Sequence, residues 1–395
     1  MGALSVDKAR DMLEELRGKI DEVDRNLVHW LAERMRLSKQ IGQVKRSAGF
    51  SLFDPEREEA LLKKLVSIND EPLLSSAVLR AVYREILAAS RSLQYPVKVA
   101  YLGPPWTYSH LAAIYLFGHE VEYHPFTSLD DVLNSVRCKQ SDIAVVPVEN
   151  TLEGSIGMIM ELLMEHDLYI VRECYIAMEY TLAGTVEKLG DVKEVYAHPR
   201  ALNQCRIWLA RNLGKVSYFE CSSTSDAAKL CREKAGRAAL CNLYAAHFYG
   251  LNVLAERIAD HPEAVTRFFA MGREKTDPSG DDKTSVIFAV SHAPGALYRA
   301  LEPCARHEVN LCRIESRPTK RFKKDFLFFV DLEGHETEDH VKLALEEMRK
   351  DLLYLKVLGS YPKALPEQPF SINRESVRSE MVGTDHLEGR NDGTI

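Results

Sequence analysis

A set of charged and polar side chains spans the first 95 residues of this 395-residue chain, and its members suit the binding of a small dianion. The cations supply charge-assisted hydrogen bonds, and the carboxyl, hydroxyl and amide groups supply direction. The set contains no nucleophile–base pair and no cluster of metal ligands. It therefore fits a reaction without a covalent step, which gains from holding one conformer and from fixed donors aimed at developing charge. The members are Arg17, Arg34, Lys45, Asp54, Arg57, Glu58, Ser90 and Gln94.

Three helices are predicted to position this set. Apolar residues recur at spacings near three and four from Leu13 to Val44, and no proline interrupts residues 7–48. Gly49 ends the pattern, and Asp54-Pro55 provides an N-cap and a first-turn proline for the second helix. At about 1.5 Å per residue the first helix spans roughly 60 Å. That is too long for a compact domain of one chain, so its apolar stripe predicts an intertwined homodimer.

The helix geometry also decides which cations can share one ligand. Arg34 and Lys45 are eleven residues apart, so they lie on one face with backbones about 16 Å apart, which long side chains can close. Arg17 lies about 25 Å from Arg34 along the axis. It can therefore contribute only from the antiparallel helix of a partner chain. The alternative is that these cations form a solvated helix face.

The polar set resembles the site of the all-helical family of chorismate mutases. The resemblance implies a rearrangement of chorismate to prephenate, in which the two arginines pair with the two carboxylates. It implies that Lys45 and Gln94 donate to the ether oxygen and that Glu58 accepts from the ring hydroxyl. Asp54 has two candidate roles, as the N-cap and as a substrate contact. The matching segments are Glu15-Leu-Arg17, Leu31-Ala-Glu-Arg34, Gly42-Gln-Val-Lys45, Asp54-Pro-Glu-Arg57-Glu58, and Ser90 with Gln94.

Residues 96–275 follow a different pattern, in which short apolar runs alternate with helical segments. This alternation predicts an α/β architecture, and polar motifs directly follow the runs, where open α/β sheets bind ligands. The predicted strands are 97–102, 143–148, 169–171, 195–197 and 238–241.

The polar motifs resemble those of prephenate dehydratases. The motifs are Gly103-Pro-x-x-Thr107-Tyr-Ser109, Pro147-Val-Glu-Asn150-Thr151 with Gly154, His198-Pro-x-Ala-Leu-x-Gln204-Cys205, Ser223-Thr-Ser-x-Ala227-Ala, and Thr266-Arg267-Phe268. The resemblance implies two α/β lobes around a cleft, as in periplasmic binding proteins, and conversion of prephenate to phenylpyruvate with loss of carbon dioxide and water. It makes Thr266 the proton donor to the leaving hydroxide. The implied prephenate-binding residues are Thr107, Ser109, Asn150, Thr151, Gln204, Ser223, Thr266, Arg267 and Phe268, with Arg267, Asn150, Thr151 and Thr107 holding the carboxylates.

Three residues depart from the dehydratase pattern. Trp106 stands where the family usually has a small residue and is expected to narrow the cleft mouth. Arg200 stands at a usual glutamine. Ala264 replaces a usual asparagine and removes a polar partner near Thr266.

Residues 283–363 predict a ferredoxin-like βαββαβ unit, with elements at 285–290, 295–306, 309–314, 326–332, 338–348 and 354–358. Through the two motifs Pro294-Gly-Ala-Leu297 and Glu315-Ser-Arg-Pro318, this unit resembles an ACT regulatory domain. The resemblance implies a phenylalanine site between paired domains. The alternative is that these motifs are only a helix start and a strand end. The implied effector-binding residues are Gly295, Ala296, Leu297, Glu315, Ser316, Arg317 and Pro318.

Composition narrows the remaining possibilities. A net charge of −7 argues against a nucleic-acid partner. The eight cysteines form no C-x-x-C pair, and no stretch suits a signal peptide or a membrane span, so we expect a cytoplasmic protein without a metal or cofactor. The basic run 320–324 is expected to be a solvated loop. The polar residues 364–395 are expected to be a disordered tail.

Together these resemblances predict an enzyme with mutase and dehydratase activities that is inhibited by phenylalanine. The main alternative is an active mutase joined to an impaired dehydratase that serves a regulatory or binding role. A third possibility, a solute-binding protein, accounts for the two lobes but not for the N-terminal helices.

Overall fold

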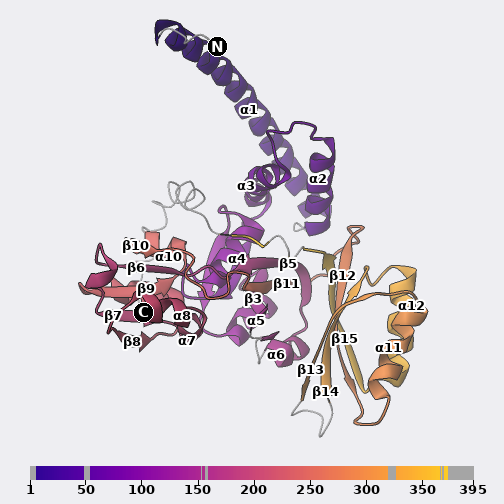
Figure 1. The fold of residues 1–395 in the computed structure, drawn as a ribbon. Coiled ribbons are helices and arrows are strands. Elements are labelled where there is room, and N and C mark those ends of the chain that lie inside the picture. The colour runs from indigo at the N-terminus through magenta and orange to yellow at the C-terminus, as the bar shows by residue number, and fades with distance from the viewer. Residues whose placement is uncertain are drawn as a thin grey trace.

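The structure is a computed structural model that describes residues 6–48, 54–152, 154–155, 159–318, 326–364, 366 and 369–371. It contains an N-terminal helical part, a two-lobed α/β part and a C-terminal four-stranded sheet (Figure 1). The predicted loop at 320–324 lies outside the described residues.

The predicted long helix is confirmed. Its C-terminal part packs against the third helix, where a Cβ at Gly42 would lie 2.9 Å from Gln94 Cα. Its N-terminal part projects from the body of the molecule (Figure 1) and leaves apolar side chains uncovered, with Leu13 53% and Trp30 69% exposed. The three helices are α1 Val6–Ala48, α2 Pro55–Ile68 and α3 Ser76–Gln94.

The first lobe is built on a mixed sheet in the order β2-β1-β3-β11-β5, with β4 paired to β3. β1, β2 and β3 are parallel, whereas β11 runs antiparallel between β3 and β5. The strands are β1 Lys98–Leu102, β2 Glu122–Phe126, β3 Ile143–Asn150, β4 Gly154–Ser155, β5 Tyr169–Ala177 and β11 Val265–Gly272, and the helices are α4 Tyr108–Phe117, α5 Leu129–Arg137 and α6 Ile159–Glu165.

The second lobe is a five-stranded sheet in the order β10-β6-β9-β7-β8. The chain enters this lobe after β5 and returns to the first lobe in β11, which confirms the prediction of two α/β lobes. Its strands are β6 Thr181–Gly184, β7 Glu194–Ala197, β8 Ser217–Glu220, β9 Arg237–Cys241 and β10 Asn252–Ala255, and its helices are η1 Leu189–Asp191, α7 Pro199–Gln204, α8 Arg206–Asn212, α9 Thr224–Cys231 and α10 Leu243–Phe248.

The C-terminal unit has the predicted βαββαβ order and an antiparallel sheet β13-β14-β12-β15. Its helices cover the sheet face that is turned away from the dehydratase-like lobes (Figure 1). The other face shares a buried apolar core with the first lobe, in which Phe269 and Val146 join Ile287 and Phe329. The elements are β12 Asp282–Val290, α11 Ala296–Arg306, β13 Leu311–Pro318, β14 Phe326–Glu333, α12 Asp339–Asp351 and β15 Tyr354–Pro362.

The prediction of a disordered tail is wrong for residues 369–371. Phe370 N donates to Tyr175 O at 2.8 Å, and its carbonyl accepts from Ala177 N at 2.9 Å, so Phe370 pairs in parallel with the edge strand β5. Its ring lies 4.8 Å from that of Tyr115. One aromatic residue and an unpaired strand edge therefore order this segment within a polar sequence. Residues 372–395 lie outside the described part of the chain.

Candidate active sites

The structure brings four members of the N-terminal polar set into two contacts. Arg34 donates through Nη1 to the buried hydroxyl of Ser90, and Lys45 Nζ lies 2.9 Å from Asp54 Oδ2. Burial lowers the pKa of Arg34. Burial alone would raise the pKa of Asp54, but hydrogen bonds from Lys45, Glu56 and the Arg57 backbone, together with the charge of Lys45, hold it below its ordinary value. These partly buried groups are paired within the chain and can exchange these partners for a ligand.

Asp54 and one further member of the set, Arg57, lie at the start of α2. Asp54 is its N-cap, because Oδ1 accepts from Arg57 N at 3.2 Å. The N-cap role is therefore observed, and the substrate contact remains a prediction. Arg57 itself is an exposed residue in the first turn of α2.

Arg17 and Gln94 differ in their surroundings. Arg17 lies on the exposed N-terminal part of α1, and within the described ranges no hydrogen bond or ion pair of its side chain is seen. Gln94 ends α3, and its backbone carbonyl accepts from Arg46 Nη1. One chain therefore does not bring Arg17 to the contacts of Arg34 and Lys45.

Glu58 has partners that the sequence pattern did not predict. Its Oε1 lies 2.5 Å from Arg91 Nη1, and its Oε2 lies 2.5 Å from Arg172 Nη2 on β5. Burial raises the pKa of this carboxyl, but the charges of Arg172 and Arg91 outweigh burial and hold the pKa below its ordinary value. Glu58 is thus an ionised group at the junction of the helical part and the first lobe.

In the two-lobed part, Thr266 and Asn150 lie together. Both residues are buried, and Asn150 Nδ2 donates to Thr266 Oγ1 at 2.9 Å across the pairing of β3 and β11. Asn150 therefore supplies an amide partner for Thr266, which the side chain of Ala264 cannot do. Thr151 Oγ1 accepts from Val265 N at 3.0 Å, so its hydroxyl joins the same strand ends.

The remaining predicted cleft residues lie mainly at helix starts. Thr107 is the N-cap of α4, and Ser223 is the N-cap of α9. Ser109 is buried in the first turn of α4, and Phe268 is buried in β11. Gln204 is buried, and its Oε1 has no hydrogen-bond partner in the described part of the chain, which leaves an acceptor for a bound ligand.

Trp106, which was expected to narrow the cleft mouth, lies buried between the two lobes. It is 4% exposed, its ring stacks on Tyr244 at 6.2 Å, and its carbonyl accepts from Asn242 Nδ2 at 2.7 Å. Burial lowers the pKa of His110 to about 3, so this ring is neutral and its Nδ1 can accept from Trp106 N. Trp106 therefore fixes the contact between the two lobes. Arg200 is an exposed residue of α7.

Arg267 lies in a different environment from the one predicted, because successive residues of a strand point to opposite faces. It points away from Thr266 into a buried cluster with the C-terminal unit. Its guanidinium lies 2.6 Å from Glu173 Oε2 and 2.6 Å from Asp331 Oδ2, and it donates to the hydroxyl of Tyr361 at 3.0 Å. Burial lowers the pKa of Arg267, but these neighbours raise it well above its ordinary value. The guanidinium of Arg267 is thus occupied by partners at the junction of the two units.

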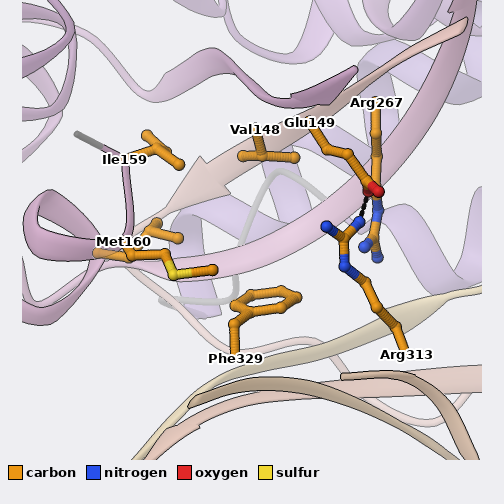
Figure 2. Close-up of a pocket in the computed structure, with 8 residues that line it drawn as sticks. Val148, Glu149, Ile159, Met160, Arg267, Arg313 and Phe329 are labelled. Atoms are coloured by element: carbon orange, nitrogen blue, oxygen red, sulfur yellow. Dashed lines mark ion pairs between the residues drawn. The ribbon is translucent and has the colours of Figure 1, made fainter. Parts of the chain in front are cut away.

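A second charged contact joins the same units beside this cluster. Figure 2 shows Arg313 of β13 reaching Glu149 of β3 in a small pocket that is also lined by Met160 and Phe329. Arg313 Nη2 also lies 2.5 Å from Glu315 Oε2. Arg313 therefore connects the predicted effector motif to the residue that precedes Asn150. Sequence reasoning missed Arg313 because no motif contains it.

The two predicted effector motifs lie at one end of the C-terminal sheet. Pro318 pairs with Phe326, which pairs with Val290, so the end of β13 adjoins the end of β12 that leads to Gly295. Gly295 has a φ of +74° and caps α11. Ala296 and Leu297 are partly buried, whereas Ser316 and Pro318 are exposed and Arg317 Nε lies 3.6 Å from Glu315 Oε1.

The described residues contain no group of three His, Cys, Asp or Glu side chains that could hold a metal ion. No helix within the same ranges has the length and apolar composition to cross a membrane.

Comparisons with known proteins identify both enzymatic units. The family model for chorismate mutase type II matches residues 16–95, and that for prephenate dehydratase matches residues 99–276. A bifunctional chorismate mutase/prephenate dehydratase from Aquifex aeolicus is 41% identical over 359 residues, covering 90% of this chain and 99% of that protein.

Solved structures are similar to a large part of this chain. A prephenate dehydratase from Arthrobacter aurescens in complex with L-Phe is 33% identical, with a TM-score of 0.63 and coverage of 74% of this chain and 98% of that chain. A chain described as a quorum quenching acylase is 28% identical, with a TM-score of 0.62 and coverage of 69% and 100%. The chain carries a chorismate mutase and a prephenate dehydratase domain and belongs to the family of bifunctional chorismate mutase/prephenate dehydratases.

Proposed function

We propose that the chain rearranges chorismate to prephenate at the polar set on α1, α2 and α3 and converts prephenate to phenylpyruvate at Thr266, under feedback inhibition by phenylalanine. The observation that carries the second step is the hydrogen bond of 2.9 Å from Asn150 to Thr266. It favours an active dehydratase over the alternative of an impaired one. The overall test is to supply chorismate and quantify prephenate and phenylpyruvate with and without phenylalanine.

In the mutase step, Arg34 and the partner's Arg17 would bind the two substrate carboxylates. Lys45 and Gln94 would donate to the ether oxygen as its bond to carbon breaks, and Glu58 would accept from the ring hydroxyl. Fixed donors aimed at developing negative charge stabilise the transition state more than the ground state. The existing contacts Lys45–Asp54 and Arg34–Ser90 would hold these donors in place before the substrate arrives.

We propose an intertwined homodimer for this step. The uncovered apolar residues on the N-terminal part of α1, such as Leu13, Leu27 and Trp30, support a second copy as the covering partner. A partner helix running antiparallel would also bring Arg17 toward Arg34 and Lys45, which one chain keeps about 25 Å apart along its helix.

In the dehydratase step, the Thr266 hydroxyl would give its proton to the departing hydroxide, so that water leaves while carbon dioxide is lost and the ring becomes aromatic. Asn150 donates to Thr266 Oγ1 and so takes up one of the two lone pairs of this oxygen, which leaves the hydroxyl proton to be donated to another group. Arg267 pairs with Glu173 and Asp331. The other polar groups proposed for the substrate are Thr107, Ser109, Asn150, Thr151, Gln204 and Ser223.

Thr266→Val tests this assignment, because it keeps the shape and removes the hydroxyl. We expect prephenate turnover to fall roughly 100-fold or more, while chorismate turnover stays near wild type. Thr276→Val is the matched control, since Thr276 is also a buried threonine but bonds to Ser360 O outside the cleft. A prephenate dehydratase rate near wild type in Thr266→Val would mean that another group protonates the leaving hydroxide.

We also propose that residues 283–363 form an ACT domain that binds phenylalanine. The βαββαβ topology and the meeting of the two effector motifs at one sheet end support this. The match to the L-Phe complex named above covers 74% of this chain. Residues 96–275 are only 180 of the 395 residues, so the match must extend beyond the two lobes. The L-Phe bound in that structure supports phenylalanine as the ligand.

Glu315 and Arg313 give the feedback a physical route. The ammonium group of phenylalanine would compete with Arg313 for Glu315. Arg313 also pairs with Glu149, next to Asn150, so a change in Arg313 alters the support of Thr266. Coupling requires that phenylalanine binds two arrangements unequally, and about 1–3 kcal/mol is an ordinary coupling free energy.

Arg313→Gln should therefore keep phenylalanine binding, measured by calorimetry, and lose most of the inhibition of prephenate turnover. In the wild type, phenylalanine should lower that turnover. Arg306→Gln on α11 is the control and should bind phenylalanine and be inhibited as the wild type is. Ser316→Ala should weaken the response. Gly295→Val is a poor probe, because its φ of +74° would strain any β-branched residue. Full inhibition in Arg313→Gln would contradict the route, and no phenylalanine binding to the wild type would contradict the sensing role itself.

We place the enzyme in the cytoplasm, in keeping with its small charged substrates and its scattered cysteines, which are free in the structure.

A further inference from the structure

Glu58 is held from two sides by arginines of different units. Arg91 belongs to α3 of the mutase, while Arg172 belongs to β5 of the dehydratase. Each guanidinium takes one carboxylate oxygen at 2.5 Å, and the side chains of Glu58 and Arg91 are only 11% and 6% exposed. A carboxylate removed from water to this degree needs such partners to remain ionised.

Arg172 is itself fixed by backbone groups of both units. Its Nη2 also lies 3.3 Å from Pro55 O at the start of α2, and its Nη1 donates to Leu116 O of α4 at 3.3 Å. The guanidinium thus bridges the mutase helix that carries Glu58 and a dehydratase helix. A planar fork with several fixed acceptors sets direction as well as charge.

Glu58 lies near the proposed mutase site as well as near the junction. It follows Asp54, the partner of Lys45, by one helical turn. Its negative charge acts on Arg34, raising the pKa of that guanidinium against the larger effect of burial. Arg91 directly follows Ser90, the partner of Arg34.

We propose that Arg172, a residue of the dehydratase sheet, is a positioning residue for the mutase reaction, which holds Glu58 ready to accept the substrate hydroxyl. This inference rests on the proposed role of Glu58. It means that the mutase site of this chain is completed by the unit that catalyses the next reaction.

The electrostatics of the junction support this role. Loss of Arg172 would leave Arg91 as the one direct cationic partner of a buried carboxylate, so the pKa of Glu58 would rise. If this pKa rises, Glu58 becomes protonated at a higher pH than in the wild type. The acid limb of the pH–rate profile of the mutase should therefore shift to higher pH. The other charged groups around Glu58 and the adjoining cavity are Arg34, Lys45, Asp54, Glu59, Lys63, Arg80, Arg84, Glu85, His119, Glu173, Asp281 and Lys363.

The test uses the full-length chain with Arg172→Gln and Arg172→Lys. We expect Arg172→Gln to lower chorismate turnover about 10- to 100-fold, as misplacement of a reacting group does, and to shift the acid limb to higher pH. Arg172→Lys keeps the charge without the planar fork, so it should recover most of the acid limb but only part of the rate. Turnover of supplied prephenate should stay near wild type in both.

Arg273→Gln is the matched control. Arg273 is another dehydratase arginine that donates to two backbone carbonyls and one carboxylate. Its partners are Val136, Ser141 and Asp142, and Glu58 is not among them. Its loss should leave the mutase rate and acid limb unchanged. Thermal unfolding of each variant shows whether it is folded. If Arg172→Gln does not fold, the mutase rates of Arg172→Lys and the wild type are compared instead.

A double-mutant cycle separates positioning from general support of the fold. If Arg172 acts through Glu58, Arg172→Gln should cost little further mutase rate in a Glu58→Gln background. An equal loss of mutase rate in both backgrounds would overturn the inference. An unchanged or increased mutase rate in Arg172→Gln would also overturn it, and so would an unchanged mutase rate in Arg172→Lys. Normal chorismate turnover in Glu58→Gln alone would instead refute the proposed role of Glu58.

Discussion

Lys45→Ala is expected to lower chorismate turnover about 30- to 900-fold, the equivalent of roughly 2–4 kcal/mol of lost transition-state stabilisation. Lys45 is partly buried and already oriented by Asp54, so its ammonium can meet developing charge without reorganising. A steady-state assay of chorismate consumption measures the change. Arg34→Ala should have a loss of similar size, because it removes a charge-assisted contact to a carboxylate.

The control is Lys39→Ala, which removes an exposed lysine from the same helix. It should leave chorismate turnover unchanged, and prephenate turnover should be normal in all three variants. Near-normal chorismate turnover in Lys45→Ala would show that the proposed mutase site is wrong.

The same variant tests the shared site. Arg17→Ala chains mixed with Lys45→Ala chains should form heterodimers with one intact site if Arg17 acts in the partner's site. Recovered activity after mixing is the expected result, and its absence from heterodimers would count against that geometry.

Glu173→Ala is expected to lower the free energy of unfolding by about 3–5 kcal/mol, because it leaves buried cations without their carboxylate. Glu173 is fully buried at its side chain and faces Arg267 at 2.6 Å and Lys283 at 2.8 Å. It also accepts from Ala364 N at 3.0 Å. A urea titration followed by circular dichroism should show a lower midpoint for the variant.

Glu302→Ala provides the comparison on the surface. Its pair with Arg306 on α11 is about half exposed on both sides, so its loss should cost at most about 1 kcal/mol. Equal midpoints for Glu173→Ala and Glu302→Ala would show that the buried cluster contributes little to the attachment of the C-terminal unit.

The sequence predicted the elements whose patterns are local. The apolar periodicity and proline-free run gave α1, and the alternation of apolar runs gave β1, β3, β7 and β9. The prediction for β5 was too short because Arg172, Glu173 and Tyr175 interrupt its apolar run. These polar residues are tolerated in the strand since they pair with groups of neighbouring units, which local patterning does not reveal.

The candidate sites were predictable only as sets of residues. The motif containing Thr266 identified its importance, but strand alternation then placed Arg267 on the opposite face, among Glu173, Asp331 and Tyr361. Likewise, the match at Glu58 gave no indication of Arg91 or Arg172. Each of these partners lies more than thirty residues away in the sequence, so only the tertiary structure brings them together.

The strand β5 limits how this gene can be divided. Arg172 faces Glu58 of the mutase, and its neighbour Glu173 faces Lys283 and Arg267 at the C-terminal junction. On the same strand, the backbone of Ile170 lies so close to Gly359 that a Cβ there would fall 2.5 Å from Ile170 O. Adjacent codons thus specify contacts with two different modules. Exchange of either module is therefore expected to require that the register of this strand is preserved.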